Sequence, residues 1–119
     1  MKFAKRTLFK LALVFFVLIV LGGSALYGGI QLDAHRKAGQ ILSENPQAKT
    51  LAEALISEMQ SESNSVRQRN MAVWVAGRLR VSETLPVMQE NYYGGTCDHE
   101  HCLCQYELKK AILRCGGEL

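Results

Sequence analysis

An uninterrupted apolar segment near the N-terminus constrains this chain more than any other feature. Residues 11–32, LALVFFVLIVLGGSALYGGIQL, contain no charged side chain. A helix rises about 1.5 Å per residue, so a segment of this length can cross a hydrocarbon layer roughly 30 Å thick. We therefore predict a transmembrane helix over residues 11–32. Only residues 33–119 then remain to build a domain outside the bilayer.

Charge is distributed unevenly along the chain. Four of the fourteen basic residues precede the apolar segment, so the other ten nearly balance the eleven acidic residues. These four are Lys2, Lys5, Arg6 and Lys10. Under the positive-inside rule we expect residues 1–10 in the cytoplasm, because only Arg36 and Lys37 closely follow the span. The C-terminal domain is then extracytoplasmic, periplasmic in a bacterium. It lacks the basic face that binding of nucleic acid requires.

The apolar segment has two interpretations. Residues 23–25, Gly-Ser-Ala, satisfy the small-x-small rule for cleavage of a signal peptide. Apolar residues nevertheless continue through Leu26, Tyr27 and Ile30, beyond the usual signal core. This length favours a retained single-span anchor.

Small residues recur every four positions in the second half of the span. Ser24 is followed by Gly28, and Ala25 by Gly29. Such small-xxx-small spacing lets two transmembrane helices pack closely, as they would in a homo-oligomer. The alternative is that these residues are simply common in membrane helices.

The residues after the span predict two helices. A juxtamembrane helix is expected to continue the span over residues 33–45. Asn45 is a suitable N-cap, and Pro46 suits the first helical position, where a missing N–H has no cost. A helix over residues 46–60 follows, with apolar residues at three- and four-residue spacing. These apolar residues are Leu51, Leu55, Ile56 and Met59.

Three further helices are expected before the C-terminus. Ser65 and Gln68 form a capping box that begins the first. Ser82 is placed to cap a helix over residues 83–93. The last helix covers residues 103–115 and is closed by two glycines. No stretch alternates with period two, so we predict an all-α domain.

Two helical hairpins follow one another in this domain. Thr50-Leu51 recurs as Thr84-Leu85 at an offset of 34 residues, and Ala72-xxxx-Gly77 recurs as Ala111-xxxx-Gly116 at an offset of 39. A first helix, a polar turn and a more buried second helix therefore occur twice. The longer second offset indicates an insertion of about five residues between the last two helices.

Residues 51–90, LAEALISEMQSESNSVRQRNMAVWVAGRLRVSETLPVMQE, resemble a HEAT repeat of the short bacterial type. Val66-Arg67 after the polar turn, an Ala-rich second helix ending in glycine, and Leu85-Pro86 in the next helix are the matching motifs. The resemblance covers residues 47–117. It implies a small α-solenoid of about two repeats over residues 46–119, with protein-binding surfaces and no catalytic residues. Solenoids usually need at least three repeats, so we expect the domain to depend on another element or a partner.

The inserted loop, TCDHEHCLC at residues 96–104, concentrates metal-binding residue types. The candidate ligands for zinc or copper are Cys97, His99, His101 and Cys102. They are crowded, however, and no second ligand pair exists elsewhere. In an oxidising compartment Cys97 and Cys102 form the natural disulfide, with Cys97–Cys104 as the alternative pairing. We therefore favour a disulfide-stapled loop, and keep a metal-binding or thiol-redox module as the alternative.

The remaining cysteines fall on the apolar stripe of the last helix. Cys104 and Cys115 share this stripe with Leu108 and Ala111. Eleven residues of helix separate the two cysteine Cα atoms by about 16 Å, whereas a disulfide needs at most about 7 Å. Buried cysteine behaves as a small hydrophobe. We predict that both cysteines, like Trp74, belong to the core.

The sequence favours an interaction role over catalysis. It contains no P-loop, GxGxxG or HExxH motif and no evident nucleophile–base pair. Tyr92 and Tyr93 precede the loop, where they either contact a partner or close the helix end. We expect a membrane-anchored adaptor or accessory subunit that binds a protein partner and uses no cofactor.

Overall fold

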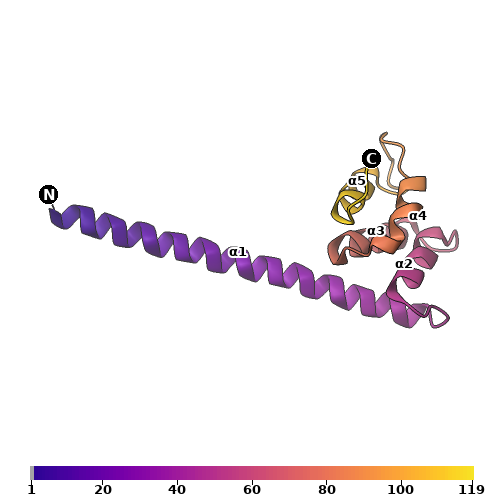
Figure 1. The fold of residues 1–119 in the computed structure, drawn as a ribbon, viewed down its shortest axis with the longest axis horizontal. Helices are drawn as coiled ribbons and strands as arrows, with labels where there is room; N and C mark the ends of the chain where they lie inside the picture. The colour runs from indigo at the N-terminus through magenta and orange to yellow at the C-terminus, as the bar shows by residue number, and fades with distance from the viewer. Residues whose placement is uncertain (1) are drawn as a thin grey trace. The chain divides into compact units, whose positions relative to one another are not determined.

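A computed structural model describes residues 2–119 of the chain, with side chains from residue 6 onward. Every regular element within this range is helical (Figure 1). In chain order these are α1 (Lys2–Glu44), α2 (Leu51–Gln60), α3 (Val66–Leu79), the 3₁₀ turn η1 (Ser82–Thr84), α4 (Leu85–Glu90) and α5 (Gln105–Arg114). The predicted all-α class is therefore confirmed.

The chain divides into two compact units, one ending at Leu32 and the other covering Asp33–Leu119. In the first unit the large apolar side chains are exposed, from 38% at Ile30 to 73% at Leu26. Among the described residues, α1 is the helix that is long and apolar enough to cross a membrane by length and composition. A lipid environment would cover this apolar surface.

The C-terminal part of α1 belongs to the second unit. Ala34, Ala38 and Ile41 follow one another at four- and three-residue spacing, and all three are buried. Ala38 and Ile41 join the same core as residues of the later helices. The segment expected to be a juxtamembrane helix is thus also a core helix of this unit.

The predicted start of the second helix was wrong. Helix α2 begins at Leu51, where the Thr50 hydroxyl accepts a hydrogen bond from the Glu53 amide at 3.2 Å. Asn45 is instead buried at the end of α1, where its amide donates to the Ile41 carbonyl at 2.9 Å and to Glu58 at 3.2 Å. Its side chain is thus occupied at the end of one helix and cannot cap the next.

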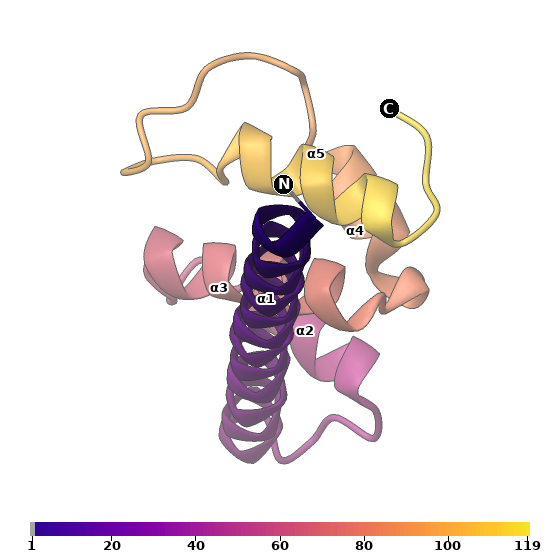
Figure 2. The same cartoon turned by 90° about the vertical axis from the view of Figure 1, so that its left-hand side faces the viewer.

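Helices α2, α3 and α5 form the centre of the second unit. Helix α3 packs against α2 on one side and against α5 on the other, and α4 packs against α5 (Figures 1 and 2). The predicted capping box begins α3, with the Ser65 amide donating to Gln68 at 3.0 Å. At the crossing of α3 and α5, a Cβ added to Gly77 would stand 2.7 Å from the Ala111 Cα atom. Glycine therefore permits the close approach of these two helices.

The helix expected over residues 83–93 is shorter and begins differently. Ser82 lies inside η1 and caps nothing, because Val81 occupies the position before that turn. Helix α4 ends at Glu90, and the Asn91 side chain donates to the Val87 carbonyl at 2.8 Å. Tyr92 and Tyr93 consequently lie in the following loop.

The last helix, α5, begins two residues later than predicted and ends close to the expected position. Gly116 adopts a left-handed φ of +83°, which suits a residue without Cβ. The Gly117 amide then donates to the Ile112 carbonyl at 2.9 Å and closes the helix.

Candidate functional site

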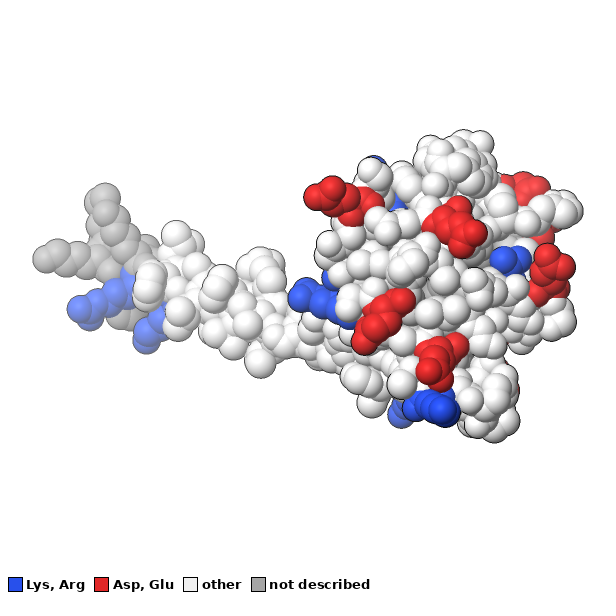
Figure 3. All heavy atoms as spheres, turned by 45° about the vertical axis from the view of Figure 1, so that its right-hand side comes forward, with Lys and Arg blue, Asp and Glu red and all other residues white. Residues whose placement is uncertain are grey.

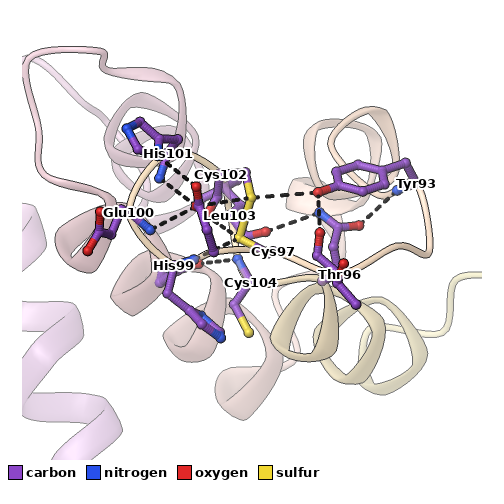
Figure 4. Close-up of a disulfide and its surroundings, with 12 residues drawn as sticks. Tyr93, Thr96, Cys97, His99, Glu100, His101, Cys102, Leu103 and Cys104 are labelled. Carbon is purple, nitrogen blue, oxygen red and sulfur yellow. Dashed lines mark hydrogen bonds and ion pairs between the residues drawn. A yellow bond between two sulfur atoms is a disulfide. The ribbon is translucent and has the colours of Figure 1, made fainter.

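The candidate site is the loop that joins α4 to α5, which extends away from the helices in Figure 2. Cys97 and Cys102 lie in it with their sulfur atoms at disulfide distance and their Cα atoms 6.0 Å apart (Figure 4). This is the favoured one of the two pairings expected from the sequence. Cys104 and Cys115 are free cysteines.

Neighbouring groups donate hydrogen bonds toward both paired sulfurs. The His99 amide lies 3.3 Å from the Cys97 sulfur. The Tyr93 hydroxyl lies 3.6 Å from the Cys102 sulfur and 3.1 Å from the Thr96 carbonyl, so its single hydrogen can serve either acceptor. The Tyr93 side chain thus contacts both ends of the loop segment 96–102, although it is 61% exposed.

Asp98 organises the tip of the loop. Its Oδ1 atom accepts hydrogen bonds from the amides of Glu100 at 3.0 Å and His101 at 2.9 Å. Its Oδ2 atom lies 2.7 Å from the His101 Nδ1 atom. The hydrogen bonds from the His101 ring and from these amides lower the pKa of Asp98 from 3.8 to about 2. These contacts hold the carboxylate in one orientation at the tip of the loop.

The predicted set of four metal ligands is not brought together. His99 and His101 are both exposed, and their rings point to different sides of the loop (Figure 4). Among the described residues, the ligand atoms that lie within 4.8 Å of one another belong to Cys97, Asp98 and Cys102. The sequence did not point to Asp98 as a site residue. An Asp side chain that accepts from amides two and three residues further along is nevertheless a common feature of turns.

Gln105 holds both ends of the loop and was also missed. This side chain is buried, and its oxygen accepts from the amides of Tyr93 at 2.8 Å and Gly94 at 3.3 Å. Its nitrogen donates to the carbonyls of Asn91 and Leu103, both at 3.1 Å. One glutamine therefore satisfies four backbone groups of a loop that has no regular structure of its own.

The free cysteines sit at the two ends of α5. Cys104 is half-buried at the N-cap position, and its amide donates to the Asn70 side chain on α3 at 2.8 Å. Cys115 is buried, and its thiol donates to the Ala76 carbonyl at 3.5 Å. Burial raises the pKa of the Cys115 thiol, and the negative charge of Glu83 adds to this effect. Cys115 lies in the core as predicted. The same prediction was wrong for Cys104, which precedes the helix as its N-cap and is only half-buried.

The predicted partner-contacting tyrosines differ in environment. Tyr92 is half-buried and packs against the core, whereas Tyr93 lies on the loop. Trp74, predicted to be core, is also half-buried, with the Arg78 guanidinium 5.8 Å from the centre of its ring. It lines an open groove of about 590 Å³ that residues from α1, α3, α5 and the loop surround.

The small residues of the span lie on an exposed part of α1. A Cβ atom added to Gly28 or Gly29 would meet nothing within 4 Å. Ser24 and Ala25 are exposed as well, and the Ser24 hydroxyl donates to the Val20 carbonyl of its own helix at 2.8 Å. All four residues are therefore exposed on α1.

No protein-family model, curated protein or solved structure matches the chain. Its function is therefore argued from the fold and the side chains described above.

Proposed function

We propose that this chain is a single-pass membrane protein whose extracytoplasmic helical unit is a HEAT-like adaptor that binds a protein partner. It would act as an accessory subunit of a membrane-associated assembly, without catalysis of its own. Anchoring is supported by the exposed apolar side chains of α1 up to Leu32. The basic residues before this segment favour a cytoplasmic N-terminus.

The packing of the second unit supports the HEAT-like assignment. Helices α2 and α3 form one hairpin and α4 and α5 a second, and α3 packs on α5 as neighbouring repeats do in a solenoid. The first helices of the two hairpins begin at Leu51 and Leu85, at the repeat offset found in the sequence. Ala38 and Ile41, in the C-terminal part of α1, belong to the same core as these helices.

The outer face of α5 is the observation on which the proposal mainly rests. Tyr106 and Leu113 lie seven residues apart on one side of this helix, and their side chains are 67% and 53% exposed. The opposite side of α5 is buried against α3 and α4. A longer solenoid would cover the outer face with a further repeat. In this protein a partner takes that place.

The charges beside these residues indicate the chemistry of the partner. Lys109 is exposed on the same face, whereas the ammonium group of Lys110, 4.5 Å from the Tyr106 ring, already pairs with the Glu107 carboxylate at 2.7 Å. Figure 3 shows both acidic and basic side chains scattered over one face of the molecule. We expect a partner surface with apolar side chains flanked by carboxylates, because such a surface complements both features.

Affinity purification of the full-length protein from detergent-extracted membranes tests the proposal. The double variant Tyr106→Ala/Leu113→Ala should lose a partner that the wild type retains. Leu42→Ala is the matched control, since it removes a 37% exposed leucine of the same unit outside this face. Retention of every wild-type partner by the double variant would contradict the assignment of this surface.

The anchor and its orientation are tested separately. The protein in membranes should keep its full-length mass, because a cleaved signal peptide would remove the residues before position 26. A reporter enzyme that works only outside the cytoplasm should be active when it is fused to the C-terminus. A shortened mature chain would leave the partner surface in place but would contradict the anchor.

A further inference from the structure

The loop between α4 and α5 gathers three atoms that can bind a metal. The sulfurs of Cys97 and Cys102 and a carboxylate oxygen of Asp98 lie within 4.8 Å of one another, and Asp98 Oδ1 is 3.9 Å from the Cys102 sulfur. Tetrahedral zinc has Zn–S bonds of about 2.3 Å and Zn–O bonds of about 2.0–2.2 Å, which places two ligand atoms roughly 3.5–3.8 Å apart. Asp98 and Cys102 thus already stand close to the separation that a shared zinc ion requires.

We propose that reduction of the Cys97–Cys102 pair turns this loop into a zinc site formed by the two thiolates and the Asp98 carboxylate. A dithiol reductant breaks the S–S bond and becomes a disulfide itself, leaving one proton on each cysteine sulfur. Zinc binding then releases these two protons to water, because both ligands bind as thiolates. A water molecule completes the tetrahedron.

The backbone geometry permits this change. The Cα atoms of Cys97 and Cys102 are 6.0 Å apart, which leaves the released sulfurs room to separate to about 3.8 Å. Four residues lie between the two cysteines, within the two-to-four-residue spacing usual for paired zinc ligands. The change therefore needs movement of the cysteine side chains and no refolding of the loop.

Groups around the three ligands hold them in position. The amides of Glu100 and His101 fix one oxygen of Asp98, and the His101 ring contacts the other at 2.7 Å. His101 is therefore a positioning residue and not a ligand. The His99 amide and the Tyr93 hydroxyl lie within hydrogen-bonding reach of the two sulfurs, where they would stabilise thiolate charge. Zinc should bind only the reduced loop, because the thiolate is the metal ligand and the sulfurs of a disulfide carry no negative charge.

Metal binding by the full-length chain in detergent tests the proposal, with Zn²⁺ and Co²⁺ as probes. The reduced protein should bind one zinc ion per chain in native mass spectrometry, and bound Co²⁺ should give sulfur-to-metal charge-transfer absorption. The oxidised protein should show neither signal. Cys97→Ser/Cys102→Ser should abolish binding, and Asp98→Asn should weaken it at least tenfold. His101→Ala should weaken it about 10–100-fold, as loss of a group that orients a ligand does.

One variant outside the ligand set is the control. Cys104→Ser should bind zinc as the wild type does, because the Cys104 thiol does not belong to the set. Trp74 fluorescence reports in each case whether the helical unit remains folded. Absence of zinc from the reduced protein would overturn the proposal. So would unchanged affinity in Asp98→Asn, or equal binding by the double cysteine variant.

Discussion

The crossing of α3 and α5 at Gly77 makes the sharpest prediction about stability. In Gly77→Ala the new Cβ atom would stand 2.7 Å from the Ala111 Cα atom and 2.8 Å from its Cβ atom. Carbon atoms in contact prefer about 3.5–4.0 Å, so the two helices must separate by nearly 1 Å. Overpacking of this kind costs about 1–3 kcal/mol. The higher helix propensity of Ala offsets up to about 1 kcal/mol of this destabilisation.

We therefore expect Gly77→Ala to lower the free energy of unfolding by about 1–2 kcal/mol. For a unit of this size the midpoint temperature should fall by roughly 5–15 °C. Thermal unfolding of the full-length protein in mild detergent, followed by fluorescence, measures the change. Trp74 is the only tryptophan of the chain and lies one turn before Gly77 in α3. It reports on the helical unit without a signal from the span.

Gly39→Ala is the matched control for this measurement. Gly39 lies in the part of α1 that belongs to the same unit, and a Cβ atom added there meets nothing within 4 Å. That variant should be more stable than the wild type by up to about 1 kcal/mol, because only helix propensity changes. If Gly77→Ala proved as stable as Gly39→Ala, the close contact between α3 and α5 would be refuted.

Three further predictions concern the loop and the cysteines. Gln105→Ala should lower the free energy of unfolding by about 2–3 kcal/mol, because four backbone groups lose a buried partner. Urea unfolding measures this change. Gln89→Ala is the control and should change the stability little, because it loses one exposed hydrogen bond. Reduction of Cys97–Cys102 should cost about 2 kcal/mol in the absence of metal, as expected for closing so short a loop. In the control variant Cys97→Ser/Cys102→Ser, the free energy of unfolding should be the same with and without reductant. Alkylation of the folded, unreduced protein should modify Cys104 well before Cys115, whose thiol is buried and has a raised pKa. Peptide mass spectrometry measures the two rates of modification. Equal rates would contradict the burial of Cys115.

The capping box of Ser65 and Gln68 was predictable from the sequence, since both partners lie within one turn. Local signals were not sufficient everywhere, because Ser82 does not cap the helix predicted after it. Asn45 shows the opposite outcome. Its sequence context favours an N-cap, but Glu58, thirteen residues away, offers a buried partner instead. A contact at that distance depends on how α1 meets α2, which no local pattern encodes.

The candidate site was predicted in composition more than in geometry. The two motif offsets predicted a long loop before the last helix, and the spacing of Cys97 and Cys102 favoured the pairing found in the structure. The sequence did not reveal that Asp98 would turn toward the sulfurs, because its orientation depends on contacts with the loop amides and with the His101 ring. Gln105 gave no signal either, since a glutamine at the start of a helix is ordinary until its four backbone partners are known.

The position of Gln105 explains how the long loop between α4 and α5 can be held without disturbing the core. Its contacts reach Asn91 and Tyr93 at one end of the loop and Leu103 at the other, so both ends are fixed before the inserted residues begin. The residues between them can change oxidation state or bind an ion while α3 and α5 keep their contact at Gly77. The proposed metal binding in the loop and the proposed partner binding on the outer face of α5 should therefore be separable. Tyr106→Ala/Leu113→Ala should leave zinc binding intact, and Asp98→Asn should leave partner binding intact, because each change lies on its own side of this fixed boundary.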